Sequence, residues 1–289
     1  MTVYPMAGRT VVITGGNSGI GLETCVALAS AGARVVMGCR NTSKADAAVD
    51  DVRRRAGSDL VESRPLDLAD LRSVEAFASG LSDLDHIDVL INNAGLILDE
   101  RVETAQGFEG TFGTNHLGHF HLTRLVLPQV HAAPAGRIVV VSSEAHRWAP
   151  QGVQLSDVNR TAKYSGWKVY GQSKLANILF VRSLTRRLEG SGVVAHALHP
   201  GSVTTNFGKE GDLGSAFSQK MMKVSEYVLI SPEKGARTSV HVASSPDAAT
   251  TSGDYWTRSR RRKAAPWARD DDAAEALWTA SERMVAAVS

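Results

Sequence analysis

The sequence predicts an α/β fold: a doubly wound parallel sheet with helices on both faces. Two observations lead to this prediction. Short β-branched runs alternate with longer amphipathic runs, and the short runs VVIT, VLI and IVVV are apolar throughout. Strands of this kind suit a parallel sheet that is buried on both sides, and strand–helix alternation is typical of right-handed crossovers. Without a linker in the pattern, we expect one domain over residues 1–289.

The expected elements follow in order. Strands are expected where β-branched and apolar residues concentrate, over residues 10–14, 33–38, 60–68, 87–95, 136–143 and 193–201. Helices are expected where apolar residues recur at helical spacing, over residues 20–31, 43–55, 71–81, 108–130 and 169–188.

Composition excludes several classes of protein. A 289-residue chain that is 43% hydrophobic and 21% charged is ordinary for a soluble globular protein. A net charge of +2 is too small to indicate nucleic acid or an anionic membrane as the main partner. Cys25 and Cys39 form no disulfide framework, which is typical of a reducing compartment. With neither a leader pattern nor an apolar stretch of about 18 residues, we expect a cytoplasmic protein without a membrane span.

A glycine-rich turn, TGGNSGIG at residues 14–21, joins the first strand to the first helix. Gly15 would allow the tight turn, and Gly19 and Gly21 would let a pyrophosphate approach the backbone and the helix N-terminus. Any strand-to-helix turn can need glycine, but the position directly after a β-branched strand favours a dinucleotide site.

The end of the second strand discriminates between nicotinamide cofactors. An acidic residue there binds the ribose hydroxyl of NAD, whereas arginine accommodates the 2′-phosphate of NADP. This chain has Cys39 and then Arg40 at that point. Arg40 could be a solvated surface residue, but a missing acid beside a base favours NADP(H) over NAD(H).

Four further motifs complete a pattern that resembles the short-chain dehydrogenase/reductase family. They are NNAG (92–95), SS (142–143), YGQSK (170–174) and HPG (199–201), and the likeness runs from about residue 8 to 245. Three segments have sequences similar to those of the retinol dehydrogenase-like branch: TNHLGHFHLT, YGQSKLANILF and the C-terminal SGDYW…ALWTASE. That branch contains many reductases of lipophilic aldehydes and ketones. The membrane-anchoring segment of many animal members is not seen, which argues against a retinoid as the natural substrate.

The resemblance implies a set of cofactor contacts in a Rossmann fold. They are Gly15, Asn17, Ser18, Gly19, Ile20, Gly21, Arg40, Asp67, Leu68, Asn92, Ala94, Tyr170, Lys174, Pro200, Gly201 and Val203. Asp67 would contact the adenine, although it could instead cap the following helix. Asn92 could do no more than tie strands together.

Tyr170 and Lys174 are the expected proton relay. A free tyrosine titrates near about 10, and an ammonium one helical turn away favours the phenolate and lowers that pKa. The four-residue spacing places both side chains on one helix face. By resemblance, Lys174 would also hold the nicotinamide ribose.

Ser143 and Asn115 would complete the catalytic set. By resemblance, Ser143 would bind the substrate oxygen and Asn115 would hold a water that leads to the lysine. Ser142 competes with Ser143 for this role, and either could be a turn cap. Asn115 could instead be a satisfied buried amide.

The same spacing occurs once more, in Tyr164 and Lys168 of YSGWK. Gly166 between them weakens a helix by about 1 kcal/mol relative to alanine, and Tyr164 precedes the apolar run that would anchor one. We therefore predict that Tyr170 is the acid and that Tyr164 lies in a substrate-side insertion.

His116, His119 and His121 invite a metal interpretation. Only the first two share a helix face, and no carboxylate or cysteine stands at ligand spacing. We expect no metal site.

Two substrate-side segments, 144–169 and 202–231, carry large apolar side chains: Trp148, Leu155, Tyr164 and Trp167, then Phe207, Phe217, Met221, Met222 and Tyr227. They favour an adaptable apolar pocket or lid over core beneath a loop. The basic run SRRRK (259–263) is interpreted as a solvated surface. The outer faces of the helices 108–130 and 169–188 make a homo-oligomer plausible.

The sequence thus predicts hydride transfer between NADP(H) and the carbonyl or alcohol group of a lipophilic ketone, aldehyde or alcohol. Two alternatives stay open. One is reduction of a conjugated C=C bond, as in light-dependent protochlorophyllide reductases, and the other is a non-catalytic NADP(H)-sensing protein. The intact Ser143, Tyr170, Lys174 and Asn115 set argues against a sensor, which could lose these residues.

Overall fold

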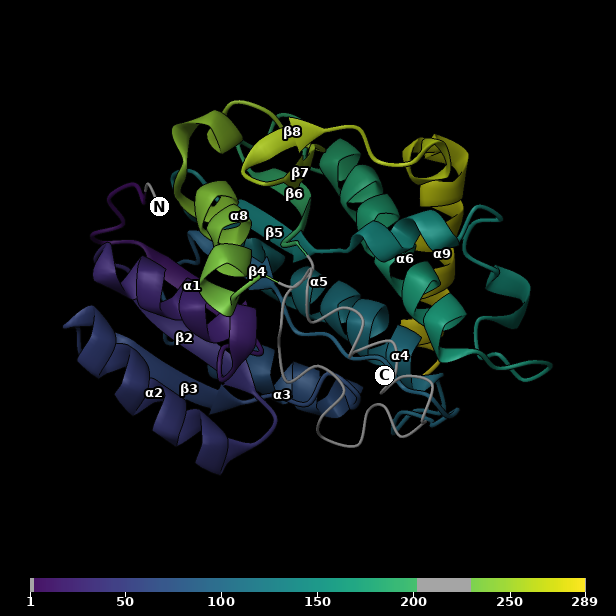
Figure 1. Ribbon diagram of the computed structural model, residues 1–289, viewed down its shortest axis with the longest axis horizontal. Helices are drawn as coiled ribbons and strands as arrows, with labels where there is room; N and C mark the ends of the chain where they lie inside the picture. The colour runs from purple at the N-terminus through teal and green to yellow at the C-terminus, as the bar shows by residue number, and fades with distance from the viewer. Residues whose placement is uncertain (1–2, 202–229, 289) are drawn as a thin grey trace.

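The computed structural model describes residues 3–201 and 230–288, and this part of the chain builds an eight-stranded sheet (Figure 1). The strands are β1 (Thr10–Thr14), β2 (Arg34–Cys39), β3 (Val61–Pro65), β4 (Val89–Asn92), β5 (Arg137–Val141), β6 (Val194–His199), β7 (Tyr255–Thr257) and β8 (Arg260–Arg262). Their order across the sheet is β3-β2-β1-β4-β5-β6-β7-β8. The first seven run parallel, and β8 is antiparallel to β7.

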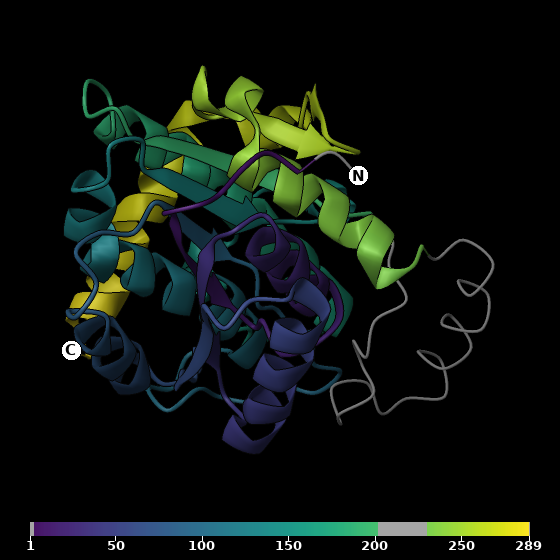
Figure 2. The same cartoon turned by 90° about the vertical axis from the view of Figure 1, so that its left-hand side faces the viewer.

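Helices cover both faces of the sheet, which confirms the predicted doubly wound fold (Figure 2). One face carries α1 (Gly19–Ser30), α2 (Thr42–Ala56) and α8 (Pro232–Ser244). The other carries α3 (Leu71–Gly80), α5 (Gly118–His131), α6 (Gly166–Arg187) and α9 (Asp271–Ala286). Short helical segments span Gly110–Phe112 (α4), Gly113–Leu117, Glu144–Trp148, Leu155–Asp157, Pro246–Ala249 and Pro266–Arg269.

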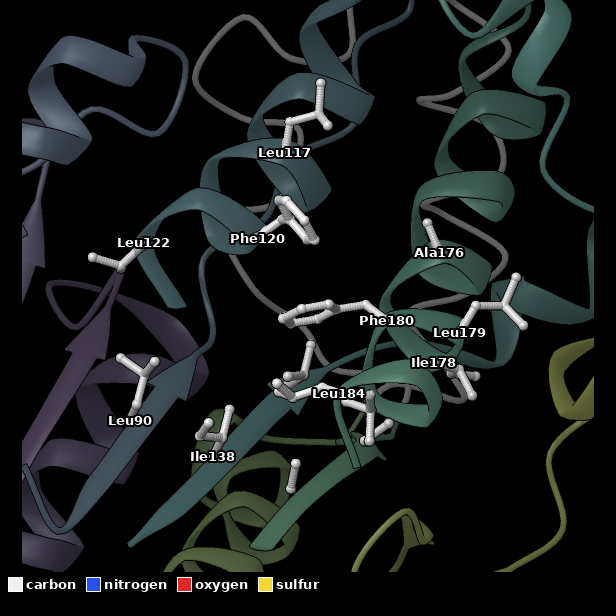
Figure 3. Packing of buried hydrophobic residues seen from close by; sticks show 14 of the residues in the cluster. Leu90, Leu117, Phe120, Leu122, Ile138, Ala176, Ile178, Leu179, Phe180 and Leu184 are labelled. Carbon is white, nitrogen blue, oxygen red and sulfur yellow. The ribbon is translucent and has the colours of Figure 1, made fainter. Parts of the chain in front are cut away.

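The two cores explain why the central strands are apolar throughout. In β1, Val12 packs into the core under α3, α5 and α6, while Val11 and Ile13 pack into the core under α1 and α8. Successive strand residues point to opposite faces, so a strand covered on both sides needs apolar residues at every position. In Figure 3, Phe120 of α5 and Phe180 of α6 point toward one another, with ring centroids 5.6 Å apart.

Several element bounds differ from the sequence-based prediction. The expected helix 108–130 begins at Gly110 and contains a π-helical segment, Gly113–Leu117. The expected strand 60–68 ends at Pro65, whose ring nitrogen cannot donate to a ladder. The expected helix 169–188 begins three residues earlier, at Gly166, where a Cβ would lie 2.2 Å from the Leu98 carbonyl oxygen. Glycine therefore starts this helix rather than weakening its middle.

Elements that the sequence did not assign follow residue 230. In α9, Asp271 and Glu275 form ion pairs with arginines of α6, and Arg187 also lies 4.0 Å above the ring of Trp278. Helix α9 therefore covers part of α6, one of the two helices whose outer faces make a homo-oligomer plausible, and the homo-oligomer stays a prediction. None of the described helices is long and apolar enough to cross a membrane.

Candidate active site

A cleft of about 830 Å³ opens at the carboxyl ends of β1 to β6. It lies where the strand order reverses between β1 and β4, the position at which doubly wound sheets bind ligands. Most of the predicted site residues line it: Gly15, Asn17, Ser18, Gly19, Ile20, Gly21, Arg40, Asp67, Leu68, Ala94, Ser143, Tyr170, Lys174, Pro200 and Gly201. Asn92 and Asn115 lie behind its wall, and Val203 is outside the described residues.

The glycine loop is shaped to bring a ligand against the backbone. Gly15 has φ of 66°, in the region that favours glycine, and a Cβ there would lie 3.0 Å from that of Ala94. At Gly21, a Cβ would lie 2.1 Å from the Gly15 carbonyl oxygen. The N-cap side chain of α1, Ser18, makes no capping hydrogen bond. The loop and the start of α1 therefore fit a phosphate group, which such N-termini favour.

Cationic side chains border the cleft beyond β2. Arg40 is exposed at its rim, and Lys44, in the first turn of α2, also lines it. Cys39, which stands where an acidic residue would bind a ribose hydroxyl, is 3% exposed, and burial raises the pKa of its thiol to about 11. A neutral thiol beside Arg40 fits a ribose that carries a phosphate.

Ser143 and Tyr170 meet at the centre of the cleft. Ser143 follows β5, and its hydroxyl hydrogen-bonds Tyr170 on α6 while also accepting the Ala145 N–H at 3.2 Å. Ser142 instead donates to the Lys174 carbonyl oxygen at 2.6 Å, and it is 2% exposed. The geometry therefore favours Ser143 over Ser142 as the hydroxyl that faces a substrate, although Ser143 is also the N-cap of the segment Glu144–Trp148.

Lys174 lies one turn after Tyr170, inside the wall of the cleft. Its Nζ is 5.6 Å from the Tyr170 ring centroid and donates to the Val141 carbonyl oxygen at 3.2 Å. The side chain is 3% exposed, and burial lowers its pKa to about 8. It is therefore poised between its charged and neutral forms near physiological pH.

The expected lowering of the Tyr170 pKa is not found. Burial raises it to about 12, and the hydrogen bond from Ser143 offsets only part of this effect. The physical reason is that burial disfavours the charged form of both groups, the phenolate and the ammonium. At neutral pH Tyr170 is thus a phenol, which can donate a proton.

Asn115 lies in the π-helical segment and is fully buried. Its Oδ1 accepts the Leu96 N–H at 2.8 Å, and its Nδ2 donates to the Leu96 carbonyl oxygen at 2.8 Å and to Ser173 Oγ at 3.0 Å. A Cβ on Gly95 would lie 3.0 Å from Lys174 Nζ and 3.4 Å from Asn115 Oδ1, so both atoms flank Gly95. Both amide protons are used within the protein, as in the alternative of a satisfied buried amide.

Tyr164 has a different environment from Tyr170. Its hydroxyl lies 2.9 Å from the Leu98 carbonyl oxygen and 3.2 Å from Oε1 of the fully buried Glu109. That carboxylate also accepts the N–H groups of Thr111 and Phe112 at the start of α4. Burial and the Glu109 charge raise the pKa of Tyr164. The side chain thus anchors the 144–169 segment to α4, outside the cleft.

The apolar residues of that segment divide into two groups. Trp148 and Trp167 line the cleft, with ring centroids 5.6 Å apart in a T-shaped arrangement. Leu155 and Tyr164 pack against the core instead. The residues assigned to the second substrate-side segment, Phe207, Phe217, Met221, Met222 and Tyr227, lie outside the described residues.

Two polar residues for which the sequence left alternatives, Asn92 and Asp67, have different positions. Asn92 donates to Thr123 Oγ1 at 2.8 Å, so its side chain ties β4 to the helix α5, rather than one strand to another. Its neighbour Asn93 lines the cleft, because successive strand residues face opposite ways. Asp67 lines the cleft and caps the Ala69 N–H at 2.9 Å, whereas Asp70 caps α3.

The three histidines point in different directions. His116 contacts Ser281 of α9, His119 contacts Thr14 of β1, and His121 contacts Glu75 of α3. Within the described residues, no three His, Cys, Asp or Glu side chains are placed to share a metal ion.

Sequence reasoning missed several residues at the site. Lys44, Glu144 and His199 line the cleft, and Thr14 and His119 form its buried support. Glu144 adjoins the SS motif, His199 is the first residue of HPG, and Thr14 is the first residue of the glycine loop. Their nearness to the site could therefore have been predicted from the sequence. Their contacts could not have been predicted, because each contact involves residues far away in the sequence.

Comparisons with known proteins agree with this architecture. The sequence model of the family described as short chain dehydrogenase matches residues 9–215. Human retinol dehydrogenase 13 is 40% identical over 282 residues, 96% of this chain and 85% of the relative. Human retinol dehydrogenase 14 is 41% identical over 294 residues, 97% of this chain and 87% of the relative. The protein is therefore an oxidoreductase by class.

Solved structures share the fold. An uncharacterized protein from Mycobacterium paratuberculosis is 38% identical with a TM-score of 0.79, over 98% of this chain and 96% of that chain. The Pseudomonas aeruginosa RhlG/NADP active-site complex, 24% identical with a TM-score of 0.68 over 88% of this chain and 96% of that chain, shows a likeness of fold alone. The chain belongs to the short-chain dehydrogenase family, and its curated relatives place it with the retinol dehydrogenases.

Proposed function

We propose that the protein transfers a hydride between NADP(H) and the carbonyl or alcohol carbon of a lipophilic substrate. The observation that carries this proposal is the meeting of Ser143, Tyr170 and Lys174 in one cleft with the glycine loop. A bound nicotinamide would supply or accept the hydride. The site residues would bind the cofactor and the substrate and would transfer the proton.

Tyr170 is the proposed general acid in carbonyl reduction. It holds its proton at neutral pH, because burial raises its pKa to about 12. Ser143, hydrogen-bonded to Tyr170, is placed to share the substrate oxygen with it. Lys174, with a pKa of about 8, would resupply the proton and favour the transient phenolate when charged. In alcohol oxidation the same groups would act in reverse.

Arg40 is the proposed contact for the 2′-phosphate of NADP(H). It borders the cleft at the end of β2, where Cys39 offers no carboxylate to a ribose hydroxyl. Loss of a charge-assisted contact costs about 1.5–3 kcal/mol, so Arg40→Gln should raise KM for NADPH roughly tenfold or more. KM for NADH should change little. Arg54 is an exposed arginine of α2, the helix that follows Arg40, and Arg54→Gln is therefore the matched control.

The substrate is proposed to be a medium-sized lipophilic alcohol or aldehyde. Trp148 and Trp167 line the same cleft as Tyr170. The names of the curated relatives bring retinol and retinal into the test, although the sequence alone argued against a retinoid as the natural substrate.

The test is a substrate panel run with NADPH and NADH. It should contain retinal, aliphatic and aromatic aldehydes and ketones, conjugated enones, and small charged carbonyl compounds. We expect turnover of lipophilic carbonyls with NADPH preferred. Turnover confined to small charged compounds would overturn the substrate proposal, reduction of enones at C=C would favour the alternative chemistry, and tight NADPH binding without turnover would favour a sensor.

A further inference from the structure

His119 connects three parts of the site through buried hydrogen bonds. It follows the π-helical segment at the start of α5 and is 1% exposed. Its Nδ1 lies 3.1 Å from the Asn115 carbonyl oxygen, and its Nε2 lies 2.8 Å from Thr14 Oγ1. Thr14 Oγ1 in turn lies 3.0 Å from the Asn93 N–H and 2.9 Å from that of Ala94.

The donor and the acceptor of each hydrogen bond made by His119 and Thr14 can be assigned. A carbonyl oxygen only accepts, so His119 Nδ1 carries a proton. Burial lowers the pKa of His119 to about 4, so the ring is neutral and Nε2 must accept. Thr14 therefore donates its hydroxyl proton to Nε2 and accepts the N–H groups of Asn93 and Ala94. Every hydrogen-bonding position of the Thr14 hydroxyl is used.

We propose that His119 is a positioning residue that holds Asn115, and the strand end before the glycine loop, in the arrangement that proton transfer through Tyr170 and Lys174 requires. The proposal rests on the proposed function of the cleft. Asn115 Oδ1 and Lys174 Nζ both lie close to the position of a Gly95 Cβ, and Asn115 fixes the backbone of Leu96, as described above. Its own carbonyl is held by His119.

The effect of losing His119 follows from this arrangement. Without the ring, the Asn115 carbonyl in the π-helical segment loses its side-chain donor, and Thr14 loses its acceptor. Both Asn115 and the β4 end, which enclose Lys174, would shift. Reacting groups are sensitive to such displacements, since about 1 Å of misplacement can lower a rate roughly a hundredfold.

His116 supplies a matched control within the same segment. It is also 1% exposed, its pKa is also lowered by burial to about 3, and its Nε2 lies 2.9 Å from Ser281 Oγ on α9. It does not line the cleft or contact Asn115 through a hydrogen bond given by the structure. Its ring also hydrogen-bonds Asn177 of α6. Its removal therefore tests the loss of a buried histidine while the hydrogen bonds to Asn115 and Thr14 stay in place.

The experiment compares His119→Phe, His119→Asn and His116→Phe in the full chain. For His119→Phe we expect kcat to fall roughly ten- to a hundredfold with little change in substrate KM, and the apparent pKa for alcohol oxidation to rise. His119→Asn, whose amide can reproduce the donor to the Asn115 carbonyl, should recover part of kcat. His116→Phe should lower the thermal unfolding midpoint while kcat stays near that of the wild-type protein.

A readout that needs no turnover separates this inference from the proposed function. The Nζ titration of Lys174, followed by NMR of the 15N-lysine-labelled protein, should move in His119→Phe and stay in place in His116→Phe. Equal effects of the two phenylalanine variants on kcat and on the Lys174 titration would overturn the positioning role. A wild-type protein that turns over nothing on the substrate panel would overturn the proposed function instead, and the titration would still decide the role of His119.

Discussion

Tyr164 and Tyr170 stand in the same four-residue pattern with lysine, yet their surroundings differ completely. Tyr170 meets Ser143 in the cleft, whereas Tyr164 bonds to Leu98 and the buried Glu109. Glu109 is an acceptor that further disfavours a tyrosinate at position 164. The environment, rather than the spacing, therefore decides which tyrosine can exchange a proton with a substrate.

The matched pair Tyr170→Phe and Tyr164→Phe tests this distinction. Tyr170→Phe should reduce kcat by at least roughly a hundredfold, because positioned proton transfer contributes about that factor or more, while NADPH still binds. Tyr164→Phe should leave kcat near the wild-type value and lower the free energy of unfolding by about 1 kcal/mol through its lost hydrogen bonds. Steady-state kinetics and chemical denaturation measure both effects, and the opposite pattern would reverse the assignment.

Lys174 should give the stability of the protein a distinct pH dependence. Its pKa is lowered from 10.5 to about 8 by burial, so between these values the unfolded chain binds more protons than the folded one. The free energy of unfolding therefore rises with pH across this window. The burial penalty, about 3 kcal/mol by the size of the shift, is fully present below pH 8 and relieved toward pH 10.5.

Lys174→Met isolates this contribution, since the variant carries no titrating group at that position. Its free energy of unfolding relative to the wild-type protein should be most favourable near pH 7 and should decline steadily up to pH 10. Urea denaturation at a series of pH values measures the difference. A constant difference between the two proteins would mean that Lys174 titrates normally.

At the scale of single residues, many residues that line the cleft could be predicted, but their electrostatics could not. The i, i+4 spacing places Tyr170 and Lys174 on one face whatever they contact, so it could be predicted locally. The upward shift of the Tyr170 pKa could not, because it depends on how deeply α6 is buried. The link from Thr14 to His119 spans 105 residues of sequence and leaves no local pattern.

The turn between β1 and α1 depends on the absence of side chains. Gly21→Ala would place a methyl group 2.1 Å from the Gly15 carbonyl oxygen, which forces the loop to move. We expect the affinity for NADPH to fall at least roughly tenfold, as binding groups lose their alignment. Fluorescence titration with NADPH measures this loss.

Gly80 at the end of α3 is the control for that variant. A Cβ there meets nothing within 4 Å, and the residue has no positive φ. Gly80→Ala should therefore raise the free energy of unfolding by up to about 1 kcal/mol, chiefly by restricting the unfolded chain. Cofactor affinity should not change, and an equal loss in both variants would contradict the role assigned to the loop.

At the scale of elements, strands were easier to place than the ends and breaks of helices. The apolar runs located β1 at its bounds and β5 to within two residues, because strands covered on both faces tolerate little else. The π-helical segment Gly113–Leu117 was not predicted, since apolar periodicity does not register one inserted residue. Gly118 next to it lies where a Cβ would be 2.5 Å from the Leu68 carbonyl oxygen, a contact visible only in three dimensions.

Helix α9 closes the core that contains α5 and α6. Trp278 lies against Phe120 and Phe180, with ring centroids 5.0 Å and 5.8 Å away, and is 6% exposed. Trp278→Ala should lower the free energy of unfolding by roughly 3–5 kcal/mol through the cavity that it leaves. Chemical denaturation measures this effect.

Trp148 provides the same substitution on the surface of the cleft. It is 56% exposed, so Trp148→Ala should change the free energy of unfolding by no more than about 0.5 kcal/mol. Its effect should appear in the KM of a lipophilic substrate instead. A stability loss in Trp278→Ala as small as the one expected for Trp148→Ala would mean that α9 contributes little to the core.

For the whole molecule, alternation of strands and helices was sufficient to predict the doubly wound sheet and the edge at which the cleft opens. The part after residue 230 was not predicted, because β7 and β8 are three residues each and lack a run long enough to show a period. Helix α9 is placed on α6 by contacts such as those of Trp278 with Phe180 and of Arg187 with Glu275, which no local pattern indicates.

The three arginines of β8 have a consequence for how copies of the protein meet. As the last strand of the sheet, β8 leaves one row of backbone hydrogen-bonding groups without a strand beside it in the described fold, and Arg260, Arg261 and Arg262 are all exposed. An open strand edge is a template for another chain. Two such edges brought together would place like charges against one another, which disfavours pairing of β8 with the β8 strand of a second molecule.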